Sequence, residues 1–210
     1  MFEQPLKFFV VFFVVVEPIS LIPLFTGLTT GAASQYKRRM AFKAVSVAAA
    51  ILLLFAVGGA GFLKLMGISL EAFRIFGGLL LFLLALEMVF ARQSGARTSS
   101  DEAAEARLRS DISVFPLAFP FIAGPGALAT ILLWFGPVHP LANATLFLGL
   151  AVAVIVVLAI SLVCLLLADP LMRVIGVTGA NVASRLLGVI LGALAVQFVL
   201  DGLRQSFIVS

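Results

Sequence analysis

The stretch that decides the fold is VEPISLIP, residues 16–23, which places two prolines five residues apart inside a long apolar run. The stretch FPFIAGPG, residues 119–126, repeats this spacing, and a shift of 102 residues superimposes both proline pairs. Two copies of the same interruption indicate an internally duplicated membrane protein whose first helix is broken in each half.

A second match lies further along the chain. RIFG at residues 74–77 matches RLLG at residues 185–188 at a shift of 111, and both continue into apolar sequence. In the later stretch, Gly188 and Gly192 are four residues apart, a spacing that favours close helix contact within the chain.

The composition excludes a water-soluble domain. Of the 210 residues, 62% are hydrophobic and only 11% are charged, whereas soluble domains carry about 25% charged residues. One cysteine and one histidine supply neither a disulfide framework nor a zinc site. We therefore expect no metal and no cofactor, and an enzyme is disfavoured because no nucleophile–base pair is evident.

Six apolar segments are each long enough to span about 30 Å of hydrocarbon. They are Leu6–Leu28, Ala44–Met66, Phe73–Phe90, Val114–Phe135, Leu141–Leu167 and Leu186–Val209. We predict an all-α polytopic membrane protein with a first three-helix repeat at 1–92 and a second at 112–210. The polar stretch 93–111 is the predicted cytoplasmic connector between them.

The basic residues set the predicted orientation. Nine follow the first, third or fifth span and three lie on the opposite side, so the positive-inside rule places both termini outside the cytoplasm. The nine are Lys37, Arg38, Arg39, Lys43, Arg92, Arg97, Arg107, Arg109 and Arg173. Because each half has an odd number of spans, the second half must be inverted relative to the first. Basic residues sorted by membrane side do not indicate nucleic acid as a partner.

The prolines in mid-membrane need a physical explanation. The pairs are Pro18 with Pro23 and Pro120 with Pro125. Each proline lacks an N–H and costs about 3 kcal/mol in a helix interior, so such backbone is tolerated only inside protein or along a wet cavity. An interrupted helix gives a new N-terminus that attracts a carboxylate, and Gly124 and Gly126 strengthen the second break. The alternative is a pair of kinks that only shape packing.

Glu17 is the most costly residue in the sequence. It lies roughly 16 Å along a helix from Leu6, where a carboxylate costs on the order of 2.5–3.5 kcal/mol on insertion scales. We therefore expect its side chain to face the protein interior. Three interpretations remain open: a proton-coupling group, a partner for a substrate ammonium, or a structural acceptor that caps the N–H groups beside Pro18.

Four further polar residues are candidates for coupling or gating. Arg74 and Arg185 are expected at the starts of the third and sixth helices, where a cation opposes the helix dipole. They would either reach the membrane interface or brace a carboxylate, and Asn181 lies one turn before Arg185. A buried amide at Gln197 is expected to bridge helices.

The residues resemble a known family. The stretch 17–25, EPISLIPLF, resembles the [Asn/Asp]-Pro-x-Gly-x-x-Pro-x-Phe signature of the MarC family of bacterial inner-membrane proteins. PLAFP at residues 116–120, running into AGPG at residues 123–126, resembles its second signature. Two positions depart from the pattern: Glu17 replaces Asn or Asp, and Ser20 replaces a common glycine.

The resemblance implies a six-span transporter of small neutral amino acids such as glycine, alanine or serine. Gly124–Ala127 would hold the substrate carboxylate. The backbone near Pro18 and Pro23, together with Glu17, would hold the ammonium. Ser20 and Thr130 could supply hydroxyls. Proton coupling through Glu17 would be a variation of this chain. A non-transporting structural or regulatory membrane protein, or a carrier or channel for another small solute, stays open as the alternative.

Overall fold

A computed structural model describes residues 3–90, 111–138 and 142–209, except the side chains of the last two. The described residues contain helices and no strand. The helices are α1 (Glu3–Val16), α2 (Pro18–Leu28), α3 (Ser34–Leu65), α4 (Leu70–Phe90), η1 (Ser113–Ile122), α6 (Pro125–Phe135), α7 (Ala144–Leu166) and α8 (Ala168–Val209). The predicted connector 93–111 lies outside the described residues, except for Asp111.

The membrane-spanning character predicted from composition is confirmed. Five helical segments are long and apolar enough to cross a bilayer, and α1 with α2 counts as one of them. The helices η1 and α6 form a bent pair with an angle of 53° between them, which makes a sixth span if the pair crosses as one.

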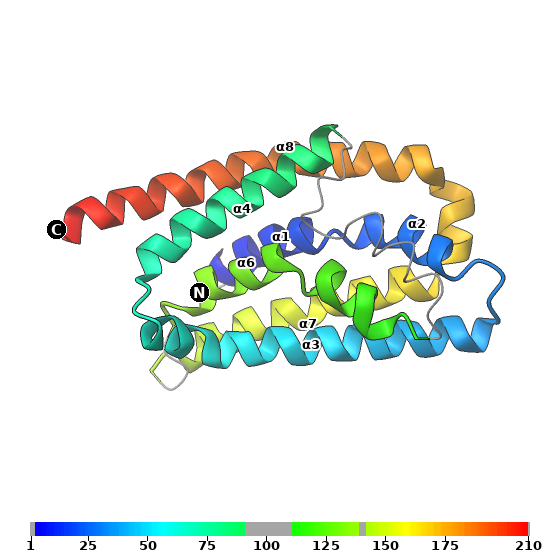
Figure 1. Cartoon of the computed structure of the whole chain (residues 1–210), viewed down its shortest axis with the longest axis horizontal. Helices are drawn as coiled ribbons and strands as arrows, with labels where there is room; N and C mark the ends of the chain where they lie inside the picture. Colours follow the sequence, from blue (N-terminus) through cyan, green and yellow to red (C-terminus); the bar gives the residue numbers. More distant parts are fainter. Residues whose placement is uncertain (1–2, 91–110, 139–141, 210) are drawn as a thin grey trace.

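The helices pack in three layers along a common direction (Figure 1). The α4–α8 pair lies on one side and the α3–α7 pair on the other, with α1, α2, η1 and α6 between them. Packing partners come in matched sets, since α3 contacts η1 and α6 while α7 contacts α1 and α2. Likewise α4 contacts α6, and α8 contacts α2. Corresponding helices of the two halves run in opposite directions (Figure 1).

Small residues set the close packing of α4 on α8. A Cβ added at Gly78 would lie 2.9 Å from the carbonyl oxygen of Ala195, and one added at Gly188 would lie 3.2 Å from that of Ala85. A Cβ at Gly202 would lie 3.2 Å from the carbonyl oxygen of Glu71. These contacts recur every seven residues on both helices, a repeat that keeps one seam in register. The close contact predicted at Gly188 is confirmed.

Two helices begin earlier than the apolar pattern predicted. The second span was expected from Ala44, but α3 starts at Ser34; the sixth was expected from Leu186, but α8 starts at Ala168. Both early segments carry charged residues, which lower the hydropathy without preventing helix formation. Within α8 the backbone kinks at Gly176, which has a φ of 65° that glycine adopts without a steric penalty.

Candidate functional site between the two broken spans

The first break consists of a single residue, Glu17, between α1 and α2. Its φ of 55° and ψ of 60° are left-handed, a conformation that costs a non-glycine residue about 1–3 kcal/mol. Its amide donates to the carbonyl of Phe13 at 2.9 Å, which completes α1, and its carbonyl accepts from the amide of Ser20 at 3.0 Å, which starts α2. Pro18 then occupies the first position of α2, where its missing N–H costs nothing.

The Glu17 side chain is buried, as predicted, with only 1% of its surface exposed. The hydroxyl of Ser20 donates to its Oε1 at 2.5 Å. The carboxylate makes no capping hydrogen bond to α2, so the interpretation that it caps the N–H groups beside Pro18 is wrong. Ser20 and Glu17 thus form one polar unit inside an apolar span.

Two backbone carbonyls near this unit also lose their helical hydrogen-bond donors. In a regular helix the carbonyls of Val14 and Ile19 would accept from residues 18 and 23, but both of those are prolines without an N–H. Both carbonyls therefore lack the donor that an unbroken helix would supply. Together with Glu17, they make this break an acceptor-rich region that suits a cation.

The second break is wider. Helix η1 has non-helical backbone at Phe115 and Phe119, and Gly124 is extended between η1 and α6, with φ −75° and ψ 175°. A Cβ at Gly124 would lie 2.1 Å from the carbonyl oxygen of Pro120. Only glycine fits at this turn, because that neighbour is backbone and cannot rotate away.

Helix α6 begins with Pro125 at its first position and Gly124 as its N-cap. Within the described residues no side chain caps this end. The amides of Gly126 and Ala127 lie in the first turn, where they have no intrahelical acceptor, and both residues are buried. This end of α6 therefore offers donors and the positive end of a helix dipole to an anion.

The last turn of α1, just before the first break, packs against the start of α6 at the second break. A Cβ on Gly126 would lie 3.3 Å from Cγ1 of Val15, two residues before Glu17. A void of about 20 Å³ lies between Val15, Leu84 on α4 and the turn at Gly124. That space suffices for about one water molecule, so the site is closed in this conformation.

The proline alignment predicted from sequence does not match the positions of the breaks. The spacing paired Pro18 with Pro120, whereas the structure places Pro18 and Pro125 at the same position, the first residue of an 11-residue helix. Pro23 lies inside α2, and Pro120 lies inside η1. Glu17 and Gly124 thus hold the same helix position, directly before the first residue of α2 and of α6.

Of the remaining predicted residues, Thr130 binds the backbone at the second break, and the others lie on α4 or α8. The Thr130 hydroxyl donates to the carbonyl of Gly126 at 2.8 Å. Arg74 donates to Gln205 Oε1 at 2.6 Å, which links α4 to α8. Asn181 and Arg185 are exposed within α8, so Arg185 is not at a helix start. The buried, bridging amide expected at Gln197 was wrong, because its side chain is exposed and donates to Asp201 on the same helix at 2.8 Å.

Sequence reasoning missed two ion pairs at the basic end of the molecule. The ammonium of Lys43 on α3 lies 2.5 Å from Asp111 at the start of η1, and that of Lys37 lies 2.8 Å from Asp169 on α8. The ammonium of Lys43, with the hydroxyl and amide of Ser113, lowers the pKa of Asp111 to about 2. Charge pairs so far apart in sequence give no local signal. Both pairs tie α3 to the second half.

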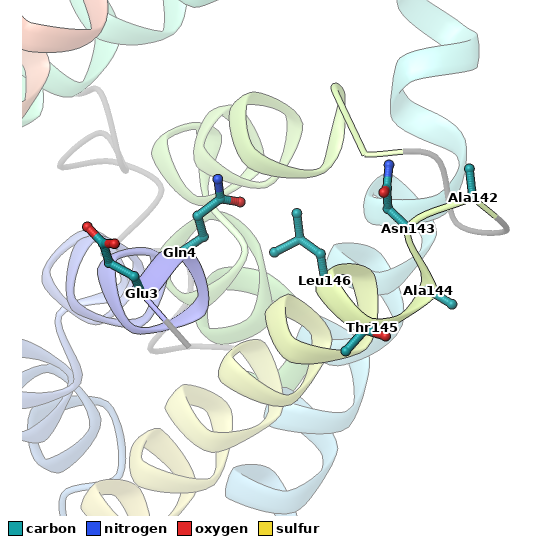
Figure 2. A pocket seen from close by; sticks show the side chains of 7 residues that line it. All are labelled: Glu3, Gln4, Ala142, Asn143, Ala144, Thr145 and Leu146. Carbon is teal, nitrogen blue, oxygen red and sulfur yellow. The ribbon is translucent and has the colours of Figure 1, made fainter. Parts of the chain in front are cut away.

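At the opposite end, the described residues leave a cavity. A cavity of about 470 Å³ separates the start of α1, at Glu3 and Gln4, from the start of α7 at 142–146. Figure 2 shows Gln4 and Leu146 facing one another across this space, with Glu3 turned away. In the other half, Asp111 just before η1 is joined to Lys43 in the third turn of α3.

A family model described as MarC family integral membrane protein matches residues 2–207 of the chain. The chain belongs to the MarC family. It is 32% identical over 206 residues to a UPF0056 membrane protein of Buchnera aphidicola (subsp. Schizaphis graminum), covering 98% of this chain and 94% of the relative. It is 31% identical over 201 residues to one from Escherichia coli K12, covering 96% and 92%.

The relatives also include an archaeal protein. A UPF0056 membrane protein of Methanocaldococcus jannaschii is 34% identical over 196 residues, covering 93% of this chain and 94% of the relative. No solved structure matches the chain. The chain is therefore a multi-pass membrane protein of a family with bacterial and archaeal members.

The left-handed backbone at position 17 explains the Asn or Asp of the MarC signature, from which this chain departs. Asn and Asp, the residues of that signature, are the non-glycine types most enriched in this conformation. Glu17 keeps the carboxylate but loses that local advantage. The position is therefore constrained by its backbone as well as by its side chain.

Proposed function

We propose that this MarC-family protein is a secondary transporter of small neutral amino acids, with glycine, alanine and serine as the first candidates. The observation that carries the proposal is the packing of Gly126, beside the uncapped donors at the start of α6, against Val15, two residues before the acceptor-rich break at Glu17. A zwitterion presents the complementary charges within one small molecule.

In this proposal each end of the substrate has its own partner. The carboxylate accepts hydrogen bonds from the first-turn amides of α6, helped by the helix dipole. The ammonium lies against Glu17 and the carbonyls whose helical donors are removed by Pro18 and Pro23. The apolar residues around the void, among them Val15 and Leu84, favour a small side chain.

We further infer that the two halves form an inverted repeat. The matched packing partners and the opposite directions of corresponding helices support this inference. The closed void, the two ion pairs at the basic end and the cavity at the other end suit one state of an alternating cycle. Opening would require one half to rock against the other.

The orientation is also a proposal. The positive-inside rule puts the basic end of α3 in the cytoplasm and both termini outside, in the inner membrane of a bacterial host. Proton coupling would use Glu17, which is the one carboxylate at the breaks among the residues that the structure describes.

The test is counterflow of radiolabelled alanine and glycine into proteoliposomes preloaded with the unlabelled amino acid. A carrier gives transient, saturable accumulation that external unlabelled substrate abolishes, whereas a channel gives flux in proportion to the gradient. No flux from folded protein in sealed vesicles would contradict the proposal.

A second candidate function is a structural or regulatory membrane protein. The observation that favours it is the size of the void at the breaks, about 20 Å³, which suits packing around two kinks. It predicts no thermal shift with any amino acid and no counterflow.

A further inference from the structure

A separate cavity lies at the basic end, away from the two breaks. It occupies about 340 Å³ between the ends of α2 and α7 and the starts of α3 and α8. Its polar lining includes Ser34, Lys37, Arg38 and Asp169, and its apolar lining includes Phe25 and Leu166. Because four membrane-spanning segments end or begin here, the cavity lies at the level of lipid headgroups.

The polar lining carries a net positive charge. The Lys37 ammonium lies 3.0 and 2.8 Å from the two carboxylate oxygens of Asp169, so that pair is neutral in sum. Arg38 then leaves the lining with one unbalanced cation. A site with this charge at a membrane surface attracts anions.

Arg38 is held at the edge of the cavity. Its guanidinium carbon lies 5.7 Å from the ring centroid of Phe42, one turn further along α3. Phe42 is itself 42% exposed, so the pair faces outward at the surface of the bundle. A guanidinium packed on an aromatic face keeps its fork of N–H donors, which suits two oxygens of one phosphate.

The apolar lining continues from the interior to the surface. Phe25 is 1% exposed and closes the cavity on its inner side, whereas Leu166 is 40% exposed at the rim. A ligand with a charged head and a hydrocarbon tail matches a cavity that has both a polar and an apolar lining. A soluble anion would use only the polar part.

We propose that this cavity binds the headgroup of an anionic phospholipid from the leaflet at the basic end. The lipid phosphate accepts hydrogen bonds from Arg38 and the Ser34 hydroxyl, and an acyl chain lies along Leu166. A choline headgroup is disfavoured because its quaternary ammonium would approach Lys37 and Arg38. This binding is independent of the proposed transport.

The experiment compares ligands on the purified full chain in detergent by thermal unfolding. The ligands are short-chain phosphatidylglycerol, phosphatidylcholine of the same chain length, and inorganic phosphate. The variants are Arg38→Gln and, as a matched control, Arg39→Gln, since Arg39 is the adjacent exposed cation and is not among the residues lining the cavity.

We expect phosphatidylglycerol to raise the Tm of the wild type and of Arg39→Gln, with little effect of the other two ligands. Arg38→Gln should weaken the apparent affinity by at least about tenfold, the effect of losing hydrogen bonds to a charged group. Arg38→Lys should recover part of the loss, because it restores the charge without the fork.

Three results would overturn the proposal. Equal losses in Arg38→Gln and Arg39→Gln would show diffuse surface charge instead of a site. Stabilisation by inorganic phosphate alone would make the ligand a soluble anion. Equal stabilisation by phosphatidylcholine would remove headgroup recognition.

Discussion

The two broken spans differ more than their shared prolines suggest. The first, α1 with α2, is interrupted at one left-handed residue and still forms one continuous span. The second, η1 with α6, is irregular along η1 and bent by 53°. The first contributes a buried carboxylate at Glu17, and the second contributes a helix N-terminus at Gly124. The two breaks thus present opposite electrostatic character, which suits the two ends of the proposed zwitterion.

The starts of the two spans differ as well. Near the start of α1, Lys7 pairs with Glu3 on the same helix, whereas η1 is preceded by Asp111, which is bound to Lys43 on α3. The second span is therefore fixed to its neighbour at a point where the first borders an open cavity. This difference predicts that motion between α1 and α7 comes more easily than motion between η1 and α3.

The largest effect is expected from filling the second break. A Cβ at Gly126 already lies 3.2–3.3 Å from Leu84, Leu81 and Val15, and the void beside it is too small for the rest of a leucine. Gly126→Leu should lower counterflow by at least about 100-fold and cost about 1–3 kcal/mol of stability through overpacking. The control is Gly58→Leu on α3, where a Cβ meets nothing within 4 Å; equal rates in both variants would contradict the site.

A smaller substitution in the same break should also lower transport strongly. In Gly124→Ala the new methyl would lie 2.1 Å from the Pro120 carbonyl oxygen, so the turn must shift by an ångström or more. We expect a fall in transport of about 10-fold to 100-fold, measured as initial uptake rate alongside insertion into vesicles. Gly61→Ala, which also has open space, should keep the wild-type rate. A Gly124→Ala variant with full activity would show that the geometry of the break is dispensable.

The first break is tested by charge, with little change in shape. Glu17→Gln keeps an acceptor for the Ser20 hydroxyl but cannot take up a proton. If Glu17 is the coupling group, counterflow should persist in this variant while its dependence on external pH disappears. The measurement is the rate of exchange and of uphill uptake between pH 5 and 8. An unchanged pH profile would exclude Glu17 as the coupling group.

The smallest effect is expected where the second span is tied to α3. Because the pKa of Asp111 is lowered to about 2 from 3.8, the Lys43 pair stabilises the fold above about pH 4 and is lost as the pH falls through 2. Both partners are partly exposed, so Asp111→Asn should cost no more than about 1 kcal/mol at neutral pH. The difference in Tm from the wild type should vanish on acidification. A difference that persists well below pH 2, where the carboxyl is protonated, would assign it to the hydrogen bonds of Ser113.

Hydropathy predicted the six spans but not where the helices begin. The first turns of α3 and α8 carry Lys37 and Asp169, which a hydropathy window reads as loop. Helix geometry continues past the bilayer because backbone hydrogen bonds form regardless of charge. In α8 the partly buried Leu171, Met172 and Ile175 follow a helical spacing, a signal that could have extended the prediction.

The site was predicted in part. The cost of a mid-membrane carboxylate correctly predicted that Glu17 is buried. The register of the proline pairs was wrong because both spans have the same proline spacing, and spacing alone does not show which proline opens the second helix. Gly124, directly before Pro125, was the available signal for a break there. Gln197 was misplaced because its acceptor, Asp201, lies one helical turn away and lets the amide stay on the surface.

The central claim is that one zwitterion spans the two breaks. The most direct measurement is inhibition of radiolabelled alanine counterflow by three unlabelled compounds. Alanine carries both charges, propionate carries only the carboxylate, and ethylamine carries only the ammonium. The account predicts that alanine competes and that neither single-charge analogue does at the same concentration. Equal competition by propionate or ethylamine would show that only one break contacts the solute, which would contradict the claim.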